Sequence, residues 1–137
     1  MLLVADANEL FGAIIAQGST LNLFFDRRLE IVSPKFILEE FREHKAEIIK
    51  KSGLNETDVS SFLILLSPKI KFFNTEQFDE FLEGAKEISP DPDDIEYFAL
   101  ALKLNCAIWS EDKELKKQSK VKIFLTSDLL KELGLKQ

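Results

Sequence analysis

The sequence predicts an α/β sandwich with a mainly parallel sheet. Short apolar runs alternate along the chain with longer amphipathic ones, which is the pattern of strands and helices taking turns. Parallel neighbours need a helical crossover between them, so this alternation favours parallel pairing. The chain has 137 residues, 45% of them hydrophobic, which suits one hydrophobic core. We therefore expect a single domain over residues 1–137.

The first half of the chain is expected to hold two strands and four helices. The strands are predicted at residues 2–8 and 29–32, and the helices at 9–17, 19–28, 35–51 and 55–66. Gly18 ends the first helix, and Ser19 suits the cap of the second. Pro34 suits the first turn of the long third helix, which ends before Gly53. Asn55 begins a run of cap-like residues before the fourth helix.

The second half is expected to hold three strands and four helices. The strands are predicted at residues 69–73, 106–109 and 121–125, and the helices at 75–88, 93–104, 111–118 and 127–133. Pro90 and Pro92 break the chain before the second of these helices, and Asp91 suits its N-cap. Every irregular gap is short, so the sequence predicts no linker between domains.

Composition excludes several classes of protein. The 24 acidic residues outnumber the 18 Lys and Arg, giving a net charge of −6, so a broad basic surface that grips nucleic acid by charge alone is excluded. Cys106 is the only cysteine and has no partner for an internal disulfide. No apolar run approaches the roughly 18–20 residues that cross a bilayer, and the first residues lack the basic start of a secretion signal. We expect a cytoplasmic protein without membrane contact.

Acidic residues fall where the predicted strands end. Parallel sheets place ligand sites beyond the carboxyl ends of their strands. Asp6 lies at the end of the first strand and is expected on the same face as Val4 and Asn8. A carboxylate within an apolar run is costly unless it is paired or binds a cation. Asp6 is therefore a candidate ligand, with a solvated turn residue as the alternative.

Helical phase selects one acid from the long third helix. Ile37, Phe41 and Ile48 form its expected buried stripe, and Glu40 lies about 80° from the centre of that stripe. Glu40 therefore flanks the core, where a side chain reaches a cleft. Glu39 lies on the opposite side of the helix and is most simply a solvated residue.

Two further acidic segments have structural as well as functional interpretations. Asp91 is explained by capping, whereas Asp94 is expected to point toward the strand ends, with Asp93 as a peripheral ligand. After the fourth strand, Ser110 suits an N-cap and Asp112 a first-turn residue that stabilises the helix dipole. Both residues also stand at the edge where a ligand site is expected.

Together the candidates predict a metal site. Asp6, Glu40, Asp94 and Asp112 each fall at a strand end or on a helix that lies over that edge. Four carboxylates in one cleft repel one another, so at neutral pH they take up protons or hold a divalent cation. Oxygen-only ligands favour Mg²⁺ or Mn²⁺, and the lack of Cys and His clusters argues against zinc.

These motifs resemble the PIN domain family over essentially the whole chain. The matching segments are Asp6-Ala7-Asn8, Glu40-Phe41, Asp94 ahead of Ala99-Leu100-Ala101, and Ser110-Glu111-Asp112. The spacings are also similar to those of the family, with Glu40 34 positions after Asp6 and Asp112 18 positions after Asp94. Four motifs in order are a more specific signal than any one of them.

The resemblance implies a three-layer α/β/α fold with a five-stranded parallel sheet. It also implies a metal-dependent endoribonuclease, of the kind found among toxins and RNA-processing factors. The catalytic and metal-binding residues would be Asp6, Glu40, Asp94 and Asp112. Asn8 and Ser110 would support them by hydrogen bonding, and Ser110 keeps the hydroxyl where Thr is common in the family.

The expected substrate is single-stranded or looped RNA, because a small rim does not span a duplex. The basic residues that are candidates to steer it are Arg27, Arg28, Arg42, Lys45, Lys113, Lys116, Lys117 and Lys120. Expected partners are an antitoxin-like protein or an RNA-processing factor, and a second copy of the chain. The homodimer is suggested by helical phenylalanines beyond the needs of one small core, namely Phe24, Phe25, Phe62, Phe78 and Phe81.

Two alternatives compete with the nuclease. A scaffold or RNA-binding subunit would keep the fold without turnover. A receiver-like phosphorylation domain also places acids at strand ends in a chain of this size. It fits poorly, because the first strand ends in one Asp rather than an acidic pair and no Lys follows the fifth strand in the expected place.

Overall fold

A single parallel sheet forms the centre of the molecule. The computed structural model describes residues 1–135 and joins five strands in the order β3-β2-β1-β4-β5. The strands are β1 Leu2–Ala5, β2 Glu30–Pro34, β3 Ile70–Phe73, β4 Ala107–Trp109 and β5 Ile123–Phe124. The predicted parallel five-stranded sheet is confirmed.

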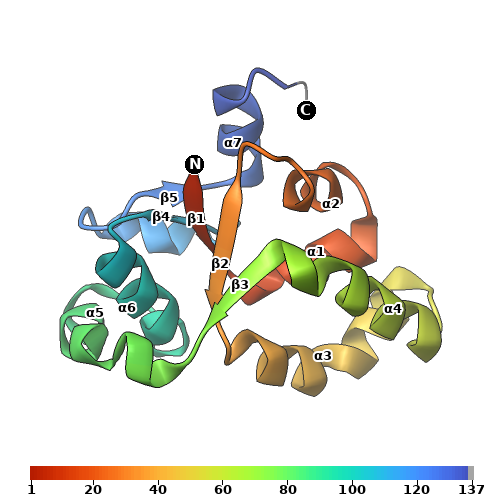
Figure 1. Ribbon diagram of the computed structural model, residues 1–137, viewed down its shortest axis with the longest axis horizontal. Helices are drawn as coiled ribbons and strands as arrows, with labels where there is room; N and C mark the ends of the chain where they lie inside the picture. Colours follow the sequence, from red (N-terminus) through yellow and green to blue (C-terminus); the bar gives the residue numbers. More distant parts are fainter. Residues whose placement is uncertain (136–137) are drawn as a thin grey trace.

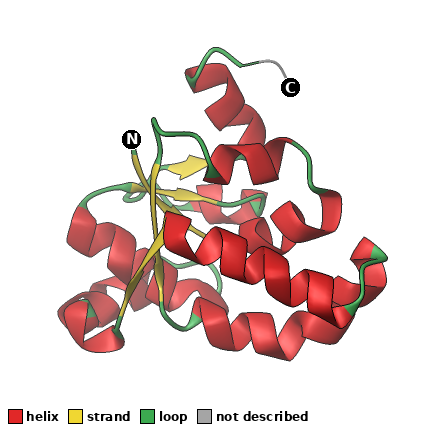
Figure 2. Cartoon of the chain, turned by 45° about the vertical axis from the view of Figure 1, so that its right-hand side comes forward, coloured by secondary structure: helices red, strands yellow, loops and turns green. Residues whose placement is uncertain are grey.

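Helices cover both sides of this sheet (Figures 1 and 2). The helices are α1 Ala7–Ala16, α2 Ser19–Phe24, α3 Ile37–Ser52, α4 Glu56–Leu66, α5 Leu82–Ile88, α6 Ile95–Leu104 and α7 Thr126–Glu132. On one side α5 packs on α6, which contacts β1, β2 and β4. On the other side α1 packs against α2 and α3, and α3 against α4. The three-layer α/β/α arrangement is therefore confirmed. None of the helices within residues 1–135 is long and apolar enough to cross a membrane.

The central position of β1 decides where the site forms. Leu3, Val4 and Ala5 are fully buried, as expected of a strand covered by helices on both faces. Ala5 pairs with Trp109, so β1 and β4 end side by side at the carboxyl edge of the sheet. The residues that follow these two strands are thereby brought together.

The first strand is shorter than the sequence predicts. It ends at Ala5 because Asp6 caps α1, accepting a hydrogen bond from the backbone N–H of Asn8 at 3.5 Å. The expectation that Asp6, Val4 and Asn8 share a strand face is therefore wrong for Asn8, which lies exposed in the first turn of a helix. The Asx cap competes with strand extension at this point.

Other boundaries also differ from prediction. Pro34 ends β2 opposite Phe73 rather than opening α3, and the next backbone N–H, that of Lys35, donates to the Phe73 carbonyl at 2.8 Å. Pro34 has no N–H to donate, which a strand end tolerates. Residues 75–88 form two 3₁₀ turns, Thr75–Gln77 and Asp79–Phe81, before α5.

Two more helices begin or end differently. Residues 111–118 hold a 3₁₀ helix, Lys113–Lys117, capped by the Asp112 side chain, and not an α-helix. In α2 Gly18 occupies the cap position and Ser19 is the first helical residue, without a capping bond. The prediction for α3 is better, since Gly53 ends it in the left-handed conformation at φ 73°.

Most of the phenylalanines expected at a homodimer interface pack in or against the core of this chain. Phe24 and Phe78 are buried within this chain, and Phe62 and Phe81 are partly buried against the core. Of the five suggested for a homodimer, only Phe25 is classed as exposed, at 37%. The argument for a homodimer from surplus phenylalanine is therefore wrong for Phe24 and Phe78.

Burial predicts a large difference between two of these rings. Phe78→Ala removes a side chain with no exposed surface, so it should lower the free energy of unfolding by about 3–5 kcal/mol. Phe25→Ala should cost about 1 kcal/mol or less, because its ring is already partly in water. Urea denaturation followed by circular dichroism measures both, and equal losses would contradict the described packing.

Candidate metal centre

The pair Asp6 and Ser110 joins the ends of β1 and β4. Asp6 is 6% exposed and Ser110 is fully buried, and the Ser110 hydroxyl donates to Asp6 Oδ2 at 2.7 Å. The Asp6 backbone N–H donates to the Trp109 carbonyl at 3.0 Å, continuing the ladder between the strands. Hydrogen bonds to the backbone and to the hydroxyl thus fix the carboxylate of Asp6 at the sheet edge.

The same hydroxyl positions a second acid. Ser110 Oγ accepts a hydrogen bond from the backbone N–H of Asp112 at 3.1 Å, while Asp112 Oδ1 caps the following 3₁₀ helix by accepting from Glu114 N at 3.0 Å. Asp112 is half-buried. The predicted N-cap role of Ser110 is wrong, because Asp112 caps the 3₁₀ helix and the Ser110 hydroxyl hydrogen goes to Asp6.

Glu40 is held from the opposite side of the cleft. It lies in the first turn of α3 and is half-buried, with Ile37, Phe41 and Ile48 forming the buried stripe as predicted. The Tyr97 hydroxyl, from α6, donates to Glu40 Oε1 at 2.5 Å. Burial and this bond to Glu40 raise the pKa of Tyr97, so the phenol stays protonated and remains a donor.

Three carboxylates come closest together. Asp91, Asp94 and Asp112 each offer an oxygen, and these oxygens all lie within 4.8 Å of one another. Asp91 also caps the turn Pro92–Asp94, accepting from Asp93 N at 2.9 Å. Capping is therefore confirmed for Asp91. The sequence predicts only this role, whereas in the structure the Asp91 carboxylate also lies in the three-residue group. Asp93 is exposed and is not one of the three.

Asp6 and Glu40 act on this group electrostatically. The pKa of Asp94 rises to about 7, first through burial and then through the negative charges of Asp6, Asp91, Asp112 and Glu40. Burial also raises the pKa of Asp6 and of Glu40, although the bonds from Ser110 and Tyr97 oppose the rise. The four neighbouring carboxylates thus disfavour the ionised form of Asp94.

The donor set fits a hard divalent cation. All the gathered groups are carboxylates, and the mutual repulsion that raises the pKa of Asp94 is relieved when a cation binds among them. Carboxylate oxygens are the ligands that Mg²⁺ and Mn²⁺ prefer. The ligand chemistry agrees with the predicted metal type and offers nothing characteristic of zinc.

Glu9 is an important residue that the sequence interpretation missed. It is 2% exposed in the first turn of α1, and its Oε2 accepts from the Thr126 hydroxyl at 3.3 Å. Its Oε1 has no hydrogen-bond partner among the described residues. The sequence did carry a signal, because Glu9 lies one turn before the buried Ala13 on the same face of α1.

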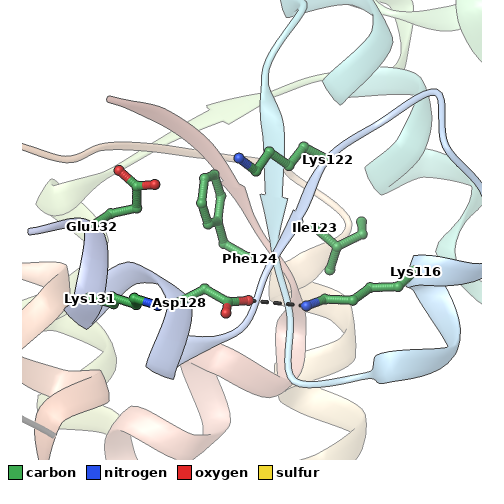
Figure 3. Close-up of a pocket in the computed structure, with 7 residues that line it drawn as sticks. All are labelled: Lys116, Lys122, Ile123, Phe124, Asp128, Lys131 and Glu132. Atoms are coloured by element: carbon green, nitrogen blue, oxygen red, sulfur yellow. Dashed lines mark hydrogen bonds and ion pairs between the residues drawn. The ribbon is translucent and has the colours of Figure 1, made fainter.

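Several of the predicted steering bases are already paired. Lys116 bonds Asp128 at 3.2 Å, Lys45 bonds Glu56 at 3.1 Å, and Lys117 pairs with Glu114. Figure 3 shows Lys116 and Lys122 around a hollow of about 490 Å³ along the edge strand β5. None of the clustered acids lines this hollow, so it is distinct from the metal centre.

A hollow lies beside Glu40. It has a volume of about 330 Å³ and is lined by Glu40, Phe36, His44 and Asp93 among others. A second hollow of about 590 Å³ shares Phe36 with it and is lined by Arg42. Arg42 thus lines a hollow that neighbours the one beside Glu40.

Comparison with known proteins agrees with this arrangement. A family model of the PIN domain matches residues 4–132. The chain belongs to the PIN domain family. PIN domains are generally nucleases and usually bind divalent metals. The resemblance inferred from the four acidic motifs is therefore confirmed.

Solved structures show the same fold at low sequence identity. PAE2754 from Pyrobaculum aerophilum is 17% identical with a TM-score of 0.70, over 98% of this chain and 90% of that chain. VapBC2 from Rickettsia felis, solved bound to a DNA fragment from its promoter, is 15% identical with a TM-score of 0.65, over 91% of this chain and 98% of that chain. A search of curated proteins gives no match.

Glu9 makes the stability of this PIN domain pH-dependent. Burial, followed by the charges of Glu111 and Asp6, raises its pKa from 4.5 to about 8. Between these values the unfolded chain has lost the proton that the folded chain keeps, so stability falls as pH rises from about 4.5 to 8. Glu9→Gln abolishes this titration and should stabilise the metal-free protein by on the order of 2–4 kcal/mol at pH 8.

The measurement is urea denaturation in EDTA at pH 5 and pH 8. The difference in the free energy of unfolding between Glu9→Gln and the parent should be small at pH 5 and large at pH 8. Glu87→Gln, at an exposed position on α5, serves as the control and should follow the parent at both. An equal difference in the free energy of unfolding at both pH values would show that Glu9 does not titrate as described.

Proposed function

We propose that this PIN domain is a Mg²⁺- or Mn²⁺-dependent endoribonuclease acting on single-stranded or looped RNA. The observation that supports it most is the convergence of carboxylates at the carboxyl edge, where Asp91, Asp94 and Asp112 approach within 4.8 Å and Asp6 and Glu40 raise the pKa of Asp94. Acids that repel one another in a folded protein are costly unless a ligand uses them.

Asp6, Glu40, Asp94 and Asp112 are the residues we propose as ligands. Asp91 joins them on the basis of its position in the three-residue group. A bound divalent cation would polarise the phosphodiester as a Lewis acid and lower the pKa of a bound water, which would make that water a better nucleophile. The acidic pocket then favours a phosphate that it would otherwise repel.

The neighbouring side chains orient these ligands. Ser110 fixes Asp6 by its 2.7 Å bond and the Asp112 backbone by its 3.1 Å bond. Tyr97 holds one oxygen of Glu40 and leaves the other free. Asn8 is exposed beside the cap formed by Asp6, where its amide is available to a substrate. Asp93 lines the adjoining hollow as a peripheral residue.

A partner protein is a second part of the proposal. The similar VapBC2 was solved in complex with promoter DNA, and an antitoxin-like or RNA-processing partner would suit this chain as well. Ile64 and Leu65 on α4 are 73% and 53% exposed, which supports an apolar contact there with such a partner or with a second copy. A scaffold without turnover is the alternative, and cleavage assays separate the two.

Removing the buried ligand should abolish cleavage. Asp6→Asn keeps the helix cap and the side-chain shape but removes the charge, so the rate with Mn²⁺ should fall roughly 100-fold or more. The assay follows a panel of labelled single-stranded RNAs with Mn²⁺ and with EDTA. Asp79→Asn, at an exposed position, should cleave like the parent. Equal cleavage by Asp6→Asn and the parent would point to a contaminating nuclease.

The role of Ser110 is tested by metal binding alone. Ser110→Ala removes the hydrogen bonds to Asp6 and to the Asp112 backbone, so Mn²⁺ affinity should weaken roughly 10–100-fold by titration calorimetry. Ser33→Ala is the matched control, because Ser33 is also fully buried but donates to the Ala5 carbonyl at 3.2 Å. Similar Mn²⁺ affinities for the two variants would show that Ser110 does not support metal binding.

A further inference from the structure

Gly12 has no packing reason to be a glycine. It lies in the interior of α1, where glycine lowers helix stability relative to alanine. A Cβ built at this position meets no atom within 4 Å, so no neighbour requires its absence. Gly84 on α5 differs, because a Cβ there would contact Leu102 Cδ1 at 3.8 Å. The space beside Gly12 is therefore open.

That space belongs to a groove between α1 and α3. The groove has a volume of about 300 Å³, and its walls include Phe11 and Ile15 on α1 and His44 on α3. Asn8 lies at one end, two residues after Asp6, and Lys51 at the other. The volume accommodates a planar ring of nucleobase size. His44 also lines the hollow beside Glu40, so the groove adjoins that hollow.

The aromatic wall of the groove is held in place. The rings of His44 and Phe11 lie 5.3 Å apart at an interplanar angle of 34°. His44 Nδ1 is 2.9 Å from the backbone carbonyl of Glu40, which only accepts, so Nδ1 carries the proton. The ring is thereby tied to the helix turn that carries a proposed metal ligand.

The charges around the groove favour a neutral occupant. The acidic and basic side chains that line the groove are Glu47 and Lys51, which pair with each other at 2.6 Å. A phosphate finds no unpaired lysine or arginine among the lining residues, whereas a nucleobase stacks on aromatic faces without charge. The Asn8 amide at the mouth offers both a donor and an acceptor to a base edge.

We propose that this groove receives one nucleobase of the bound RNA strand, from a nucleotide next to the phosphate at the metal centre. This inference rests on the proposed function. Gly12 leaves the floor of the groove open, and the His44 ring, which packs on the buried Phe11, provides the stacking surface. Base recognition is thus separated from the acidic pocket by about one turn of α3.

Filling the groove tests the proposal. RNA binding is measured by fluorescence anisotropy with labelled hexaribonucleotides and Mg²⁺, in an Asp6→Asn background that prevents cleavage. Gly12→Leu should weaken binding roughly tenfold, because the stacked base is displaced. Ala16→Leu adds the same side chain at an exposed position of α1 and should bind like its background protein.

A stability comparison excludes misfolding as the cause. Gly12→Ala should raise the thermal midpoint by about 3 °C through helix propensity while weakening RNA binding. Gly84→Ala should raise the midpoint without changing binding. A Gly12→Ala protein that is more stable and binds RNA as tightly as its background would overturn the proposal.

Abasic nucleotides identify what enters the groove. One abasic substitution, moved along the hexamer, should weaken binding roughly tenfold at a single position, and this loss should disappear in Gly12→Leu. If the abasic substitution weakens binding by the same factor in Gly12→Leu as in the background protein, the base does not bind in this groove. A Gly12→Leu protein that no longer binds a protein partner but still binds RNA would also overturn the proposal. Unchanged binding by Gly12→Leu with normal Mn²⁺-dependent cleavage by the native chain contradicts only the groove. Absence of any RNA binding or cleavage contradicts the proposed function as well.

Discussion

The hydrogen bond from Ser110 to Asp6 is the interaction on which the centre depends. It joins the ends of two adjacent strands, and the same hydroxyl accepts from the Asp112 backbone. A buried carboxylate without such partners would be too costly to keep at the edge of an apolar sheet. With them, Asp6 stays within electrostatic reach of Asp94 and Asp112, and the remaining acids are positioned around it.

The surrounding elements oppose the resulting repulsion. Tyr97 donates to Glu40, and the cap bonds of Asp91 and Asp112 fix two more carboxylates to the backbone. Glu9 remains the least compensated, with one oxygen lacking a partner among residues 1–135. The folded state therefore retains electrostatic strain at this edge, and a cation that binds only the folded chain would release it. Stability and metal binding would be coupled for this reason.

Sequence patterns predicted the alternating fold because the buried strands are apolar and the long helix has a clear stripe at Ile37, Phe41 and Ile48. Local competition was harder to predict. Asp6 ends β1 by capping, and the expected long helix is interrupted at Phe78, whose φ of −136° is not helical. The first outcome depends on a side-chain bond to the backbone and the second on the local backbone of one residue, and periodicity contains neither.

The site was predictable where an acid follows a strand and less so where the acid lies on a helix. Asp6 and Asp112 follow from the edge of a parallel sheet, and Glu40 from helical phase. The sequence predicts only a cap at Asp91, because capping explains this residue without reference to the other acids. Glu9 and Tyr97 depend on which helices meet across the cleft, a tertiary property that their own segments do not show.

Placing the acids also explains the charge of the chain. Six carboxylates, those of Asp6, Glu9, Glu40, Asp91, Asp94 and Asp112, are described at or beside the centre. Removing these six from the 24 acids leaves 18, equal to the number of lysines and arginines. The formal excess of six acids is thus assigned to one edge of the sheet, where the raised pKa values of Glu9 and Asp94 keep part of that charge protonated, and the remaining acids and bases are equal in number. An RNA bound as we propose would be repelled chiefly where a cation would neutralise the protein, so its binding would depend on the metal.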